Sequence, residues 1–260
     1  MPPPRIPTEA DFSPISSVLP HKLHFPSPPE STTSILILFH GLGDHESPFA
    51  TFARNMSLPG VLAISVRGTA PLPAAFLPGA GDQQHFHWGD DLSVDTNTGE
   101  LDSDPGFDKA ARLVMQKLVK DTLIDRCGWE MNDILLFGFG QGASLALGLA
   151  SRLRSVERIV DISDGDEATR GKIGKTCKGV VSIGGPLPQS MVPSLSSREK
   201  SNTPVLVCQL DEDEADAVKR EFKDVRVVNW KRKEVAMPRD RDEMFPIMKF
   251  IADQLNKGFT

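Results

Sequence analysis

The sequence has few cysteines, no excess of basic residues and no long apolar run. Cys127, Cys177 and Cys208 are too few for a disulfide framework, which favours a reducing compartment. The net charge of −6 gives no support for a nucleic-acid partner or an anionic membrane surface. No run of about 18 apolar residues predicts a transmembrane segment, and the N-terminus lacks the apolar core of a signal peptide. We therefore expect a protein of the cytoplasm, or of the cytoplasm and nucleus.

The length and composition suit one α/β domain. The 260 residues are 39% hydrophobic and 25% charged, which is ordinary for a globular protein large enough to bury a continuous core. Residues 1–30 are rich in proline and serine, so we expect an extended or disordered N-terminal segment, with residues 21–25 as a candidate edge strand. The α/β domain is expected over residues 31–260.

Apolar segments separated by helical patterns predict a mostly parallel sheet. The first segment has no polar alternation, which is typical of a strand buried on both faces. Because strands alternate with helices, we expect helices on both faces of the sheet. A polar stretch at residues 163–175 is expected to be a surface insertion. The expected strands are residues 35–39, 61–66, 134–137, 179–183, 205–210 and 225–230.

Two helices have clear signals at their starts. Residues 103–105, Ser-Asp-Pro, predict a cap and a first turn ahead of an apolar stripe over residues 110–118. The last helix has an apolar face over residues 244–255. Pro246 restricts its start to about Asp242, because proline is tolerated in a first helical turn.

The most informative stretch is residues 134–145, which read Ile-Leu-Leu-Phe-Gly-Phe-Gly-Gln-Gly-Ala-Ser-Leu. A strand that turns into a helix through Gly-x-Ser-x-Gly is typical of the nucleophile elbow of α/β-hydrolases, where the serine hydroxyl stands clear of the sheet. In this chain the middle residue is Gly140. Ser144 comes one helical turn later and is expected on the buried face of the helix. The stretch predicts the scaffold of an enzyme without its reactive atom.

A second glycine-rich turn follows the first predicted strand, at residues 40–44, His-Gly-Leu-Gly-Asp. In α/β-hydrolases the corresponding loop donates one backbone N–H to an oxyanion hole, and the residue after the nucleophile donates another. In this chain the two donors would be Leu42 and Gln141. Alone, the turn is also typical of an ordinary strand-to-helix connection. Together with the later glycine turn, it favours a hydrolase scaffold.

These motifs resemble the acyl-protein thioesterase and carboxylesterase family of α/β-hydrolases. Further segments carry the resemblance in chain order: Trp-Gly-Asp at residues 88–90, Ser-Ile-Gly-Gly-Pro-Leu-Pro at residues 182–188, and the C-terminal helix at residues 243–251. The resemblance covers residues 31–255. It implies an α/β-hydrolase fold and the hydrolysis of acyl thioesters or carboxylic esters through a Ser, Asp and His triad, with no metal or other cofactor.

The resemblance also assigns the triad positions, and two of the three lack the required side chain. The nucleophile position is Gly140 and the acid position is Asp213. Counting back from Glu243 places Met237 at the histidine position. All six histidines lie between residues 21 and 87, so no local shift of register supplies a base after the acid.

We therefore expect a pseudoenzyme, inactive or barely active, that retains an apolar cleft beside Leu42 and Gly140. Phe86, Trp88 and Leu187 are expected to line this cleft, which would bind an acyl chain, an ester or a protein partner. Glycine reaches strained turn conformations without penalty, so the loss of the serine should leave the fold intact.

One alternative keeps a weak ester or thioester hydrolase with relocated catalytic groups. His85 and His87 lie just before Trp88, on a segment that could flank the cleft. Either imidazole could act as a general base on a bound water. The other interpretation of His85 and His87 is that they are surface-loop histidines without a catalytic role.

The other alternative is a dinucleotide-binding protein. Gly138-x-Gly140-x-x-Ala143 satisfies the dinucleotide fingerprint after a strand, and Asp161 stands near the offset expected for a ribose-binding acid. The position of the fingerprint in the middle of the chain counts against this interpretation, as does the unexplained turn at Leu42.

Overall fold

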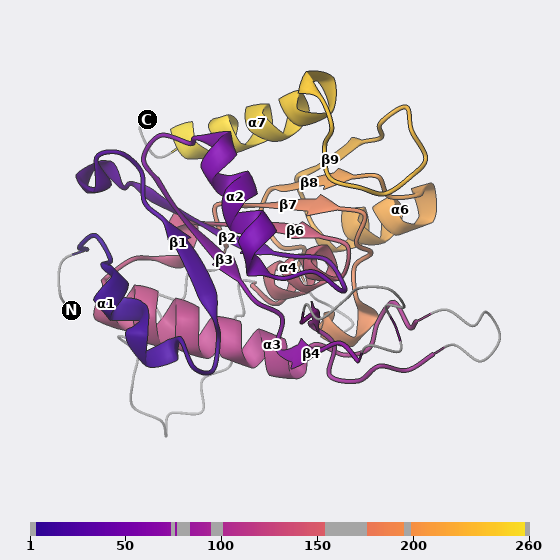
Figure 1. Ribbon diagram of the computed structural model, residues 1–260. Helices are drawn as coiled ribbons and strands as arrows, with labels where there is room; N and C mark the ends of the chain where they lie inside the picture. The colour runs from indigo at the N-terminus through magenta and orange to yellow at the C-terminus, as the bar shows by residue number, and fades with distance from the viewer. Residues whose placement is uncertain are drawn as a thin grey trace.

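The computed structural model describes residues 4–73, 76, 84–94, 101–153, 176–194 and 199–257. Within these ranges, seven strands form one sheet in the order β1-β3-β2-β6-β7-β8-β9 (Figure 1). β1 is antiparallel to β3 and the other neighbours are parallel, which confirms the predicted mostly parallel sheet. A separate hairpin pairs β4 with β5. The strands are β1 (His21–His24), β2 (Ser34–Phe39), β3 (Val61–Val66), β4 (Ala70–Pro71), β5 (Phe86–His87), β6 (Ile134–Phe139), β7 (Gly179–Ile183), β8 (Val205–Cys208) and β9 (Val225–Val228).

The central strand β2 is buried on both faces, as its sequence predicts. Ile35 and Ile37 belong to one apolar cluster, while Leu36 and Leu38 belong to another on the opposite face. Successive side chains of a strand point to opposite faces, so each cluster takes every second residue. All six β2 side chains are buried.

The strand register brings the carboxyl ends of the central strands to one edge of the sheet. Phe39 of β2 lies opposite Gly138 of β6 and Val66 of β3, and Ile183 of β7 lies opposite Phe139. The loops that follow β2, β6 and β7 therefore leave the sheet side by side. Ligands bind at this edge in open α/β sheets.

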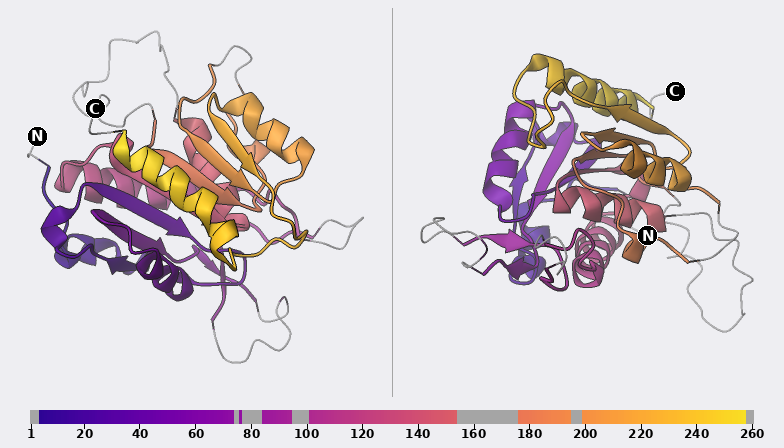
Figure 2. Two further views of the ribbon diagram at one scale, coloured as in Figure 1. Left: turned by 90° about the horizontal axis from the view of Figure 1, so that it is seen from above. Right: turned by 90° about the vertical axis from the view of Figure 1, so that its right-hand side faces the viewer.

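Helices cover both faces of the sheet, which confirms the predicted layers (Figures 1 and 2). α2 (Glu46–Met56) and α7 (Arg241–Asn256) pack on the Leu36 and Leu38 face. α4 (Gln141–Arg152) and α6 (Glu212–Glu221) pack on the other face, as does α3 (Asp108–Arg112), which continues as the π-helical segment η4 (Leu113–Arg126). The short helices are α1 (Glu9–Phe12), η1 (Ser13–Ile15), η2 (Pro29–Ser31), η5 (Met131–Asp133) and η6 (Gln189–Met191).

The start of α3 differs from the prediction. The helix begins at Asp108, three residues after Pro105, and not with Pro105 in its first turn. The Asp90 carboxylate accepts hydrogen bonds from the backbone N–H groups of Asp108 and Lys109, at 2.6 and 2.9 Å. A carboxylate is favoured at a helix N-terminus. Because this cap comes from a loop 18 residues earlier, the local Ser-Asp-Pro signal could not show it.

Strands β8 and β9 each end two residues before their predicted limits. Gln209, directly after β8, has a φ of 60°, which ends the extended conformation. Its side-chain oxygen accepts a hydrogen bond from the backbone N–H of Trp230, at 2.6 Å. One glutamine side chain therefore links the ends of both strands.

Helix α7 begins one residue earlier than predicted. Its first residue is Arg241, and the Asp240 carboxylate caps it by accepting a hydrogen bond from the Glu243 backbone N–H at 2.9 Å. Pro246 consequently lies in the second turn. The expectation that Pro246 lies in the first turn of the helix is therefore wrong.

The N-terminal segment is folded onto the domain, so the prediction of an extended or disordered segment is wrong for its described part. Phe12, Ile15 and Leu19 are buried in the main core. The Arg5 guanidinium also pairs with the Asp11 carboxylate at 2.5 Å. Three buried apolar side chains offset the cost of ordering a segment rich in proline and serine. The predicted edge strand is confirmed as β1.

Some predictions fall outside the described residues. These are the surface insertion at residues 163–175 and Asp161 of the dinucleotide alternative. In the ranges that are described, the structure has no helix with both the length and the apolar character needed to cross a bilayer.

Candidate functional site

The turn between β6 and α4 has the backbone conformation of a strained elbow. Gly140 has φ 51° and ψ −122°, a combination that residues with a side chain rarely adopt. Its N–H donates to the Ile183 carbonyl at 2.8 Å, which ties the turn to the end of β7. Its carbonyl accepts from the Ala143 and Ser144 N–H groups, at 2.9 and 3.1 Å. The chain thus reverses from strand to helix within one residue.

The space beside Gly140 differs from that beside the two flanking glycines. A Cβ atom on Gly138 would lie 2.4 Å from the Cα of Ala143, and one on Gly142 would lie 2.4 Å from the His40 carbonyl oxygen. A Cβ atom on Gly140 would meet nothing nearer than the Gly41 Cα, at 3.9 Å. The flanking glycines are required by close backbone approach, whereas position 140 has room for a side chain.

The loop after β2 places a second turn beside this elbow. In the described part of the chain, the backbone N–H groups of Leu42 and Gln141 donate to no other group. Gly43, which has a φ of 78°, donates its own N–H to the Phe86 carbonyl at 2.9 Å. The Leu42 side chain is 40% exposed. These two N–H groups have no other acceptor and lie near a helix N-terminus. They can therefore donate hydrogen bonds to a carbonyl oxygen or stabilise an oxyanion.

Gln141 has a second role that the sequence did not predict. Its side-chain oxygen accepts a hydrogen bond from the backbone N–H of Trp88, at 2.7 Å. The Trp88 indole N–H donates to the His40 carbonyl at 2.8 Å. These bonds join the elbow, the loop after β2 and the segment after β5 into one unit. Trp88 of the Trp-Gly-Asp motif therefore holds these three segments together by hydrogen bonds and is itself buried beneath the site.

Two of the residues expected to line the cleft are core residues. Trp88 is 0% exposed and Leu187 is 5% exposed, so their side chains offer almost no surface to a ligand. Phe86 is half-buried, and the Arg67 guanidinium lies over its ring, 4.7 Å from the centroid. Apolar surface at the site comes from Leu42 and Phe86, and the expectation of a lining role for Trp88 and Leu187 is corrected.

His40 is a structural residue of the loop and not a base. Its Nε2 accepts a hydrogen bond from the Gly68 backbone N–H at 2.8 Å, so its Nδ1 carries the proton and donates to the Gly41 carbonyl at 2.7 Å. Burial lowers the pKa of His40 to about 4. The imidazole is therefore neutral at pH 7, with both nitrogens occupied.

His85 and His87 lie next to the Leu42 turn. The Nδ1–H of His85 donates to the Gly43 carbonyl at 2.5 Å, while its buried Nε2 has no hydrogen-bond partner among the described residues. His87 pairs with Ala70 across the β4–β5 hairpin, and its buried Nδ1 likewise has no partner in the part of the chain that the structure describes. Burial, followed by the charge of Lys109, lowers the pKa of His87. Both are half-buried or buried residues and not surface-loop histidines.

The residues predicted at the acid and base positions, Asp213 and Met237, do not contact each other in the structure. Asp213 lies on the exposed first turn of α6, after β8, and Asp211 rather than Asp213 caps that helix by accepting the Glu214 N–H at 2.8 Å. Met237 is half-buried and packs against the apolar cluster under α2 and α7. The structure records no interaction between Asp213 and Met237.

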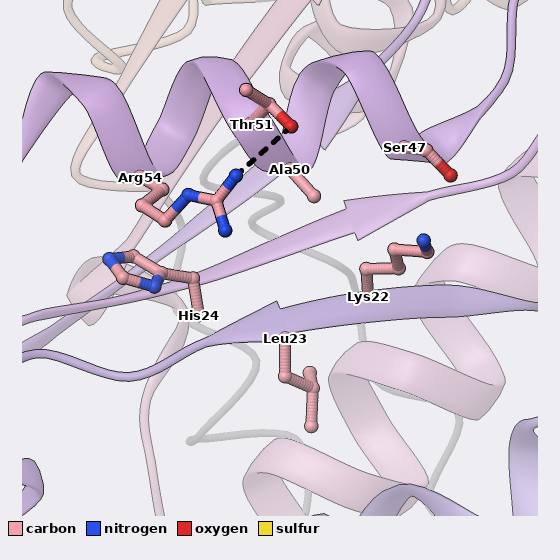
Figure 3. A pocket seen from close by; sticks show the side chains of 7 residues that line it. All are labelled: Lys22, Leu23, His24, Ser47, Ala50, Thr51 and Arg54. Carbon is pink, nitrogen blue, oxygen red and sulfur yellow. Dashed lines mark hydrogen bonds between the residues drawn. The ribbon is translucent and has the colours of Figure 1, made fainter.

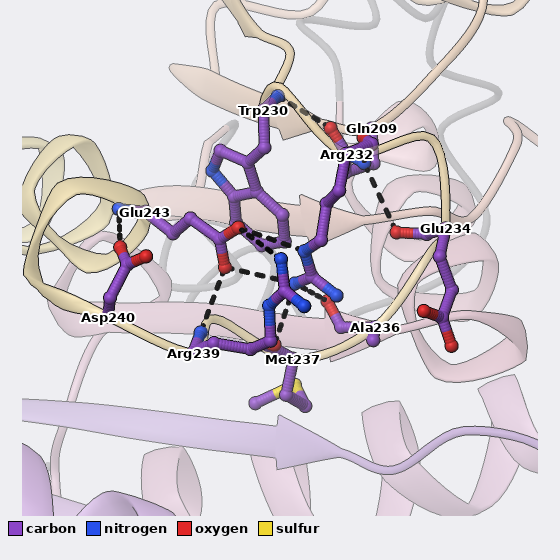
Figure 4. A network of polar contacts seen from close by, with 9 residues as sticks. All are labelled: Gln209, Trp230, Arg232, Glu234, Ala236, Met237, Arg239, Asp240 and Glu243. Carbon is purple, nitrogen blue, oxygen red and sulfur yellow. Dashed lines mark hydrogen bonds and ion pairs between the residues drawn. The ribbon is translucent and has the colours of Figure 1, made fainter.

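An ion pair holds the loop of residues 231–240, in which the sequence resemblance predicts the histidine position (Figure 4). The Arg232 Nε lies 2.9 Å from the Glu243 carboxylate, and the two side chains are only 9% and 10% exposed. Arg232 also donates to the Met237 carbonyl at 2.8 Å, and the Arg239 backbone N–H donates to Glu243 at 2.9 Å. No local sequence pattern pairs Arg232 with Glu243, so the sequence did not reveal this network.

The same loop packs against the turn that follows β7. A Cβ atom on Gly184 would lie 2.0 Å from Cγ1 of Val235, and one on Gly185 would lie 2.3 Å from the Gly140 carbonyl oxygen. The Val235 side chain is 43% exposed. An aliphatic residue, rather than an imidazole, thus stands on the turn beside the elbow.

Other reactive groups near the sheet are unsuited to catalysis. Burial raises the pKa of Cys177 and of Cys208 to about 12, so neither thiol forms a thiolate near neutral pH. Ser144 is 1% exposed on the inner face of α4, as predicted. Among the described side chains, no group of three His, Cys, Asp or Glu could hold a metal ion.

Comparisons with known proteins agree with this architecture. The phospholipase/carboxylesterase family model matches residues 23–163. An uncharacterized hydrolase of Schizosaccharomyces pombe is 31% identical over 229 residues, which are 85% of this chain and 83% of that protein. Acyl-protein thioesterase 2 of Zea mays has the same fold with a TM-score of 0.58 and 17% identity, over 90% of this chain and 98% of that one. The Bacillus cereus carboxylesterase superposes with a TM-score of 0.58 and 15% identity, over 95% of this chain and 100% of that one.

Proposed function

Because the chain belongs to the phospholipase/carboxylesterase family of α/β-hydrolases, we propose that it binds an acyl or ester ligand at the elbow without the serine-based turnover of that fold. The observation that carries the proposal is Gly140. It has the conformation of a nucleophile elbow and open space beside its Cα, yet it has no hydroxyl to attack a carbonyl carbon.

The missing groups remove the two steps that a serine hydrolase depends on. Without a hydroxyl at residue 140, no acyl-enzyme forms at the elbow. Without an imidazole in the loop of residues 231–240, the histidine of the triad is missing as the base for an attacking serine hydroxyl. Asp213 then has no histidine to orient.

The groups that would hold a ligand remain. The N–H groups of Leu42 and Gln141 are uncommitted in the described chain, and both can donate to a carbonyl oxygen. The exposed Leu42 side chain and the half-buried Phe86 ring offer apolar contact for an acyl chain. A protein partner that presents an acyl group or an apolar side chain would use the same surface. We propose that the protein acts in the cytoplasm.

The test is the hydrolysis of a short carboxylic ester and of an acyl thioester by purified protein. We expect no turnover by the wild type above a weak background, since removal of a triad leaves a residual acceleration of about 10³–10⁴-fold over water in a well-studied protease. Gly140→Ser should stay poor, because a serine without a base is a weak nucleophile. Any gain should need Gly140→Ser together with Met237→His. Robust wild-type turnover would refute the proposal.

A weak hydrolase with relocated groups is the second candidate, and one observation favours it. Within the described ranges the buried Nε2 of His85 and Nδ1 of His87 have no hydrogen-bond partner, and a bound water is the usual partner of such atoms. If wild-type turnover is found, His85→Gln and His87→Gln should each reduce it while the circular dichroism spectrum stays unchanged. Unreduced rates in both variants would exclude this route.

A further inference from the structure

A hollow of about 240 Å³ lies between β1 and α2, at the edge of the sheet. Figure 3 shows the side chains of both elements around it. In the sheet, β3 and β2 separate β1 from β6 and its elbow. The hollow is therefore a different place from the hydrolase-like site. It is lined by Lys22, Leu23 and His24 of β1 and by Ser47, Ala50, Thr51 and Arg54 of α2.

The sequence explains why these residues share one hollow. Positions 47, 50, 51 and 54 follow the i, i+3, i+4, i+7 spacing, so they form one stripe on α2. Lys22 and His24 are two residues apart on β1 and point to the same face, toward α2, while Leu23 packs against the core on the other face. Small side chains at three of the α2 positions leave the gap open.

The described lining of the hollow carries positive charge. None of the described lining residues is acidic. In the described part of the chain, Lys22 and Arg54 form no ion pair, whereas Arg67 pairs with Glu46, the first residue of α2, at 2.7 Å. Arg54 makes one long contact, from Nη2 to the Thr51 hydroxyl at 3.4 Å. Lys22 and Arg54 are exposed cations that share this hollow, and an anion bound there would offset their charge.

From this arrangement we infer that the hollow binds a phosphate monoester group. The guanidinium of Arg54 presents a planar fork that suits phosphate oxygens, and Lys22 adds a compact charge. The hydroxyls of Ser47 and Thr51 add two neutral donors on the same wall. Together these are four donor groups, two of them charged. They suit a tetrahedral phosphate group, with three terminal oxygens and a charge near −2, better than a carboxylate with two oxygens and a single charge.

The phosphate group could belong to a soluble metabolite or to a lipid headgroup, and the experiment distinguishes the two. Isothermal titration at constant ionic strength would use inorganic phosphate and glycerol 3-phosphate, with chloride as the reference anion. Vesicle co-sedimentation would compare phosphatidylcholine with phosphatidylcholine that contains phosphatidic acid. The variant is Lys22→Gln with Arg54→Gln. The control is Lys223→Gln with Arg220→Gln, which removes the same charge from exposed positions at and after α6.

We expect saturable binding with one site per chain, and a dissociation constant at least about tenfold higher in the Lys22 and Arg54 double variant than in the wild type or the control. Binding of glycerol 3-phosphate assigns a soluble ligand. Binding confined to phosphatidic acid vesicles, and lost in the same double variant, assigns a lipid headgroup. Absence of binding in both assays would overturn the inference, as would equal binding by the two double variants. Neither result depends on whether the elbow is catalytic.

Discussion

The buried guanidinium of Arg232 and the carboxylate of Glu243 lie 2.9 Å apart, and the same guanidinium holds the carbonyl oxygen of Met237. In this way an ion pair fixes the backbone at Met237, the residue that the sequence resemblance predicts at the histidine position. The backbone conformation of residues 231–240 does not depend on an imidazole. The Arg232–Glu243 pair links the start of this loop to the first turn of α7.

Loss of one partner of this pair should destabilise the fold. Glu243→Gln leaves a nearly buried guanidinium without its charge partner, which is more costly than losing an exposed pair. We expect a thermal midpoint several degrees below that of the wild type. Asp253→Asn, which breaks the exposed pair with Arg226, is the control and should have little effect. Equal midpoints for both variants would show that the Arg232 pair does not hold the loop.

The same pair predicts a dependence of stability on pH. Burial raises the pKa of Glu243, but hydrogen bonds from the Arg239 N–H and from Arg232 outweigh it, so the pKa lies below its ordinary value of 4.5. The unfolded chain then takes up this proton first as the pH falls. The stabilisation by Glu243 is complete above about pH 4.5 and is lost as the pH falls through the lowered pKa. Urea denaturation of the wild type and Glu243→Gln from pH 7 to pH 3 measures this, and the difference between them should shrink in acid.

His40 predicts a second effect of pH with a different window. Its pKa is lowered from 6.5 to about 4 by burial, so the unfolded chain binds the proton more tightly than the folded chain. Stability should therefore fall by up to about 3 kcal/mol as the pH falls from 6.5 to 4. His40→Gln keeps an acceptor for the Gly68 N–H but does not titrate. Urea denaturation at four pH values should show a shallower loss in this variant, and parallel curves would contradict the assignment.

The glycines of the elbow should differ in their tolerance of a side chain. Gly140→Ala introduces no close contact, because the nearest atom lies 3.9 Å from the new Cβ, and should cost roughly 1–3 kcal/mol through backbone strain alone. Gly142→Ala places a Cβ atom 2.4 Å from the His40 carbonyl oxygen and should cost more. Chemical denaturation of both variants measures the two losses. The opposite ranking would show that position 140 is not open.

The N-terminal segment should be essential to stability. Phe12 is 1% exposed, so Phe12→Ala should lower the free energy of unfolding by about 3–5 kcal/mol. Val18 lies in the same segment and is 51% exposed, so Val18→Ala should have little effect. A Phe12→Ala protein as stable as Val18→Ala would mean that residues 9–19 do not belong to the core in solution.

Periodicity and glycine spacing were sufficient to predict the sheet and the elbow. Residues 134–139 form a buried strand, and Gly140 has the positive φ that the sharp turn from strand to helix requires. These features depend on local sequence, because a strand, a sharp turn and a helix each have their own residue pattern.

Contacts between distant segments could not be predicted in the same way. Asp90 caps a helix that begins at Asp108, and Arg232 pairs with Glu243 across a loop. Phe12 reaches the core from a segment whose composition is that of a disordered chain. A charged or apolar residue has no signature that names its partner, so these contacts require the folded chain.

The most direct test of the central claim is the reactivity of a thiol placed at residue 140. Gly140→Cys would put a strong nucleophile in open space near the N-terminus of α4, where a thiolate is favoured. Cys127, Cys177 and Cys208 are buried, and their pKa values are raised, so they should stay unreactive.

Intact-mass spectrometry of native protein after exposure to a short acyl thioester measures this reactivity. We predict one acyl group on Gly140→Cys, and none on the wild type or on Ser144→Cys, whose new thiol would be buried in α4. A wild-type protein that acquires an acyl group would contradict the account, as would a Gly140→Cys protein acylated no faster than Ser144→Cys.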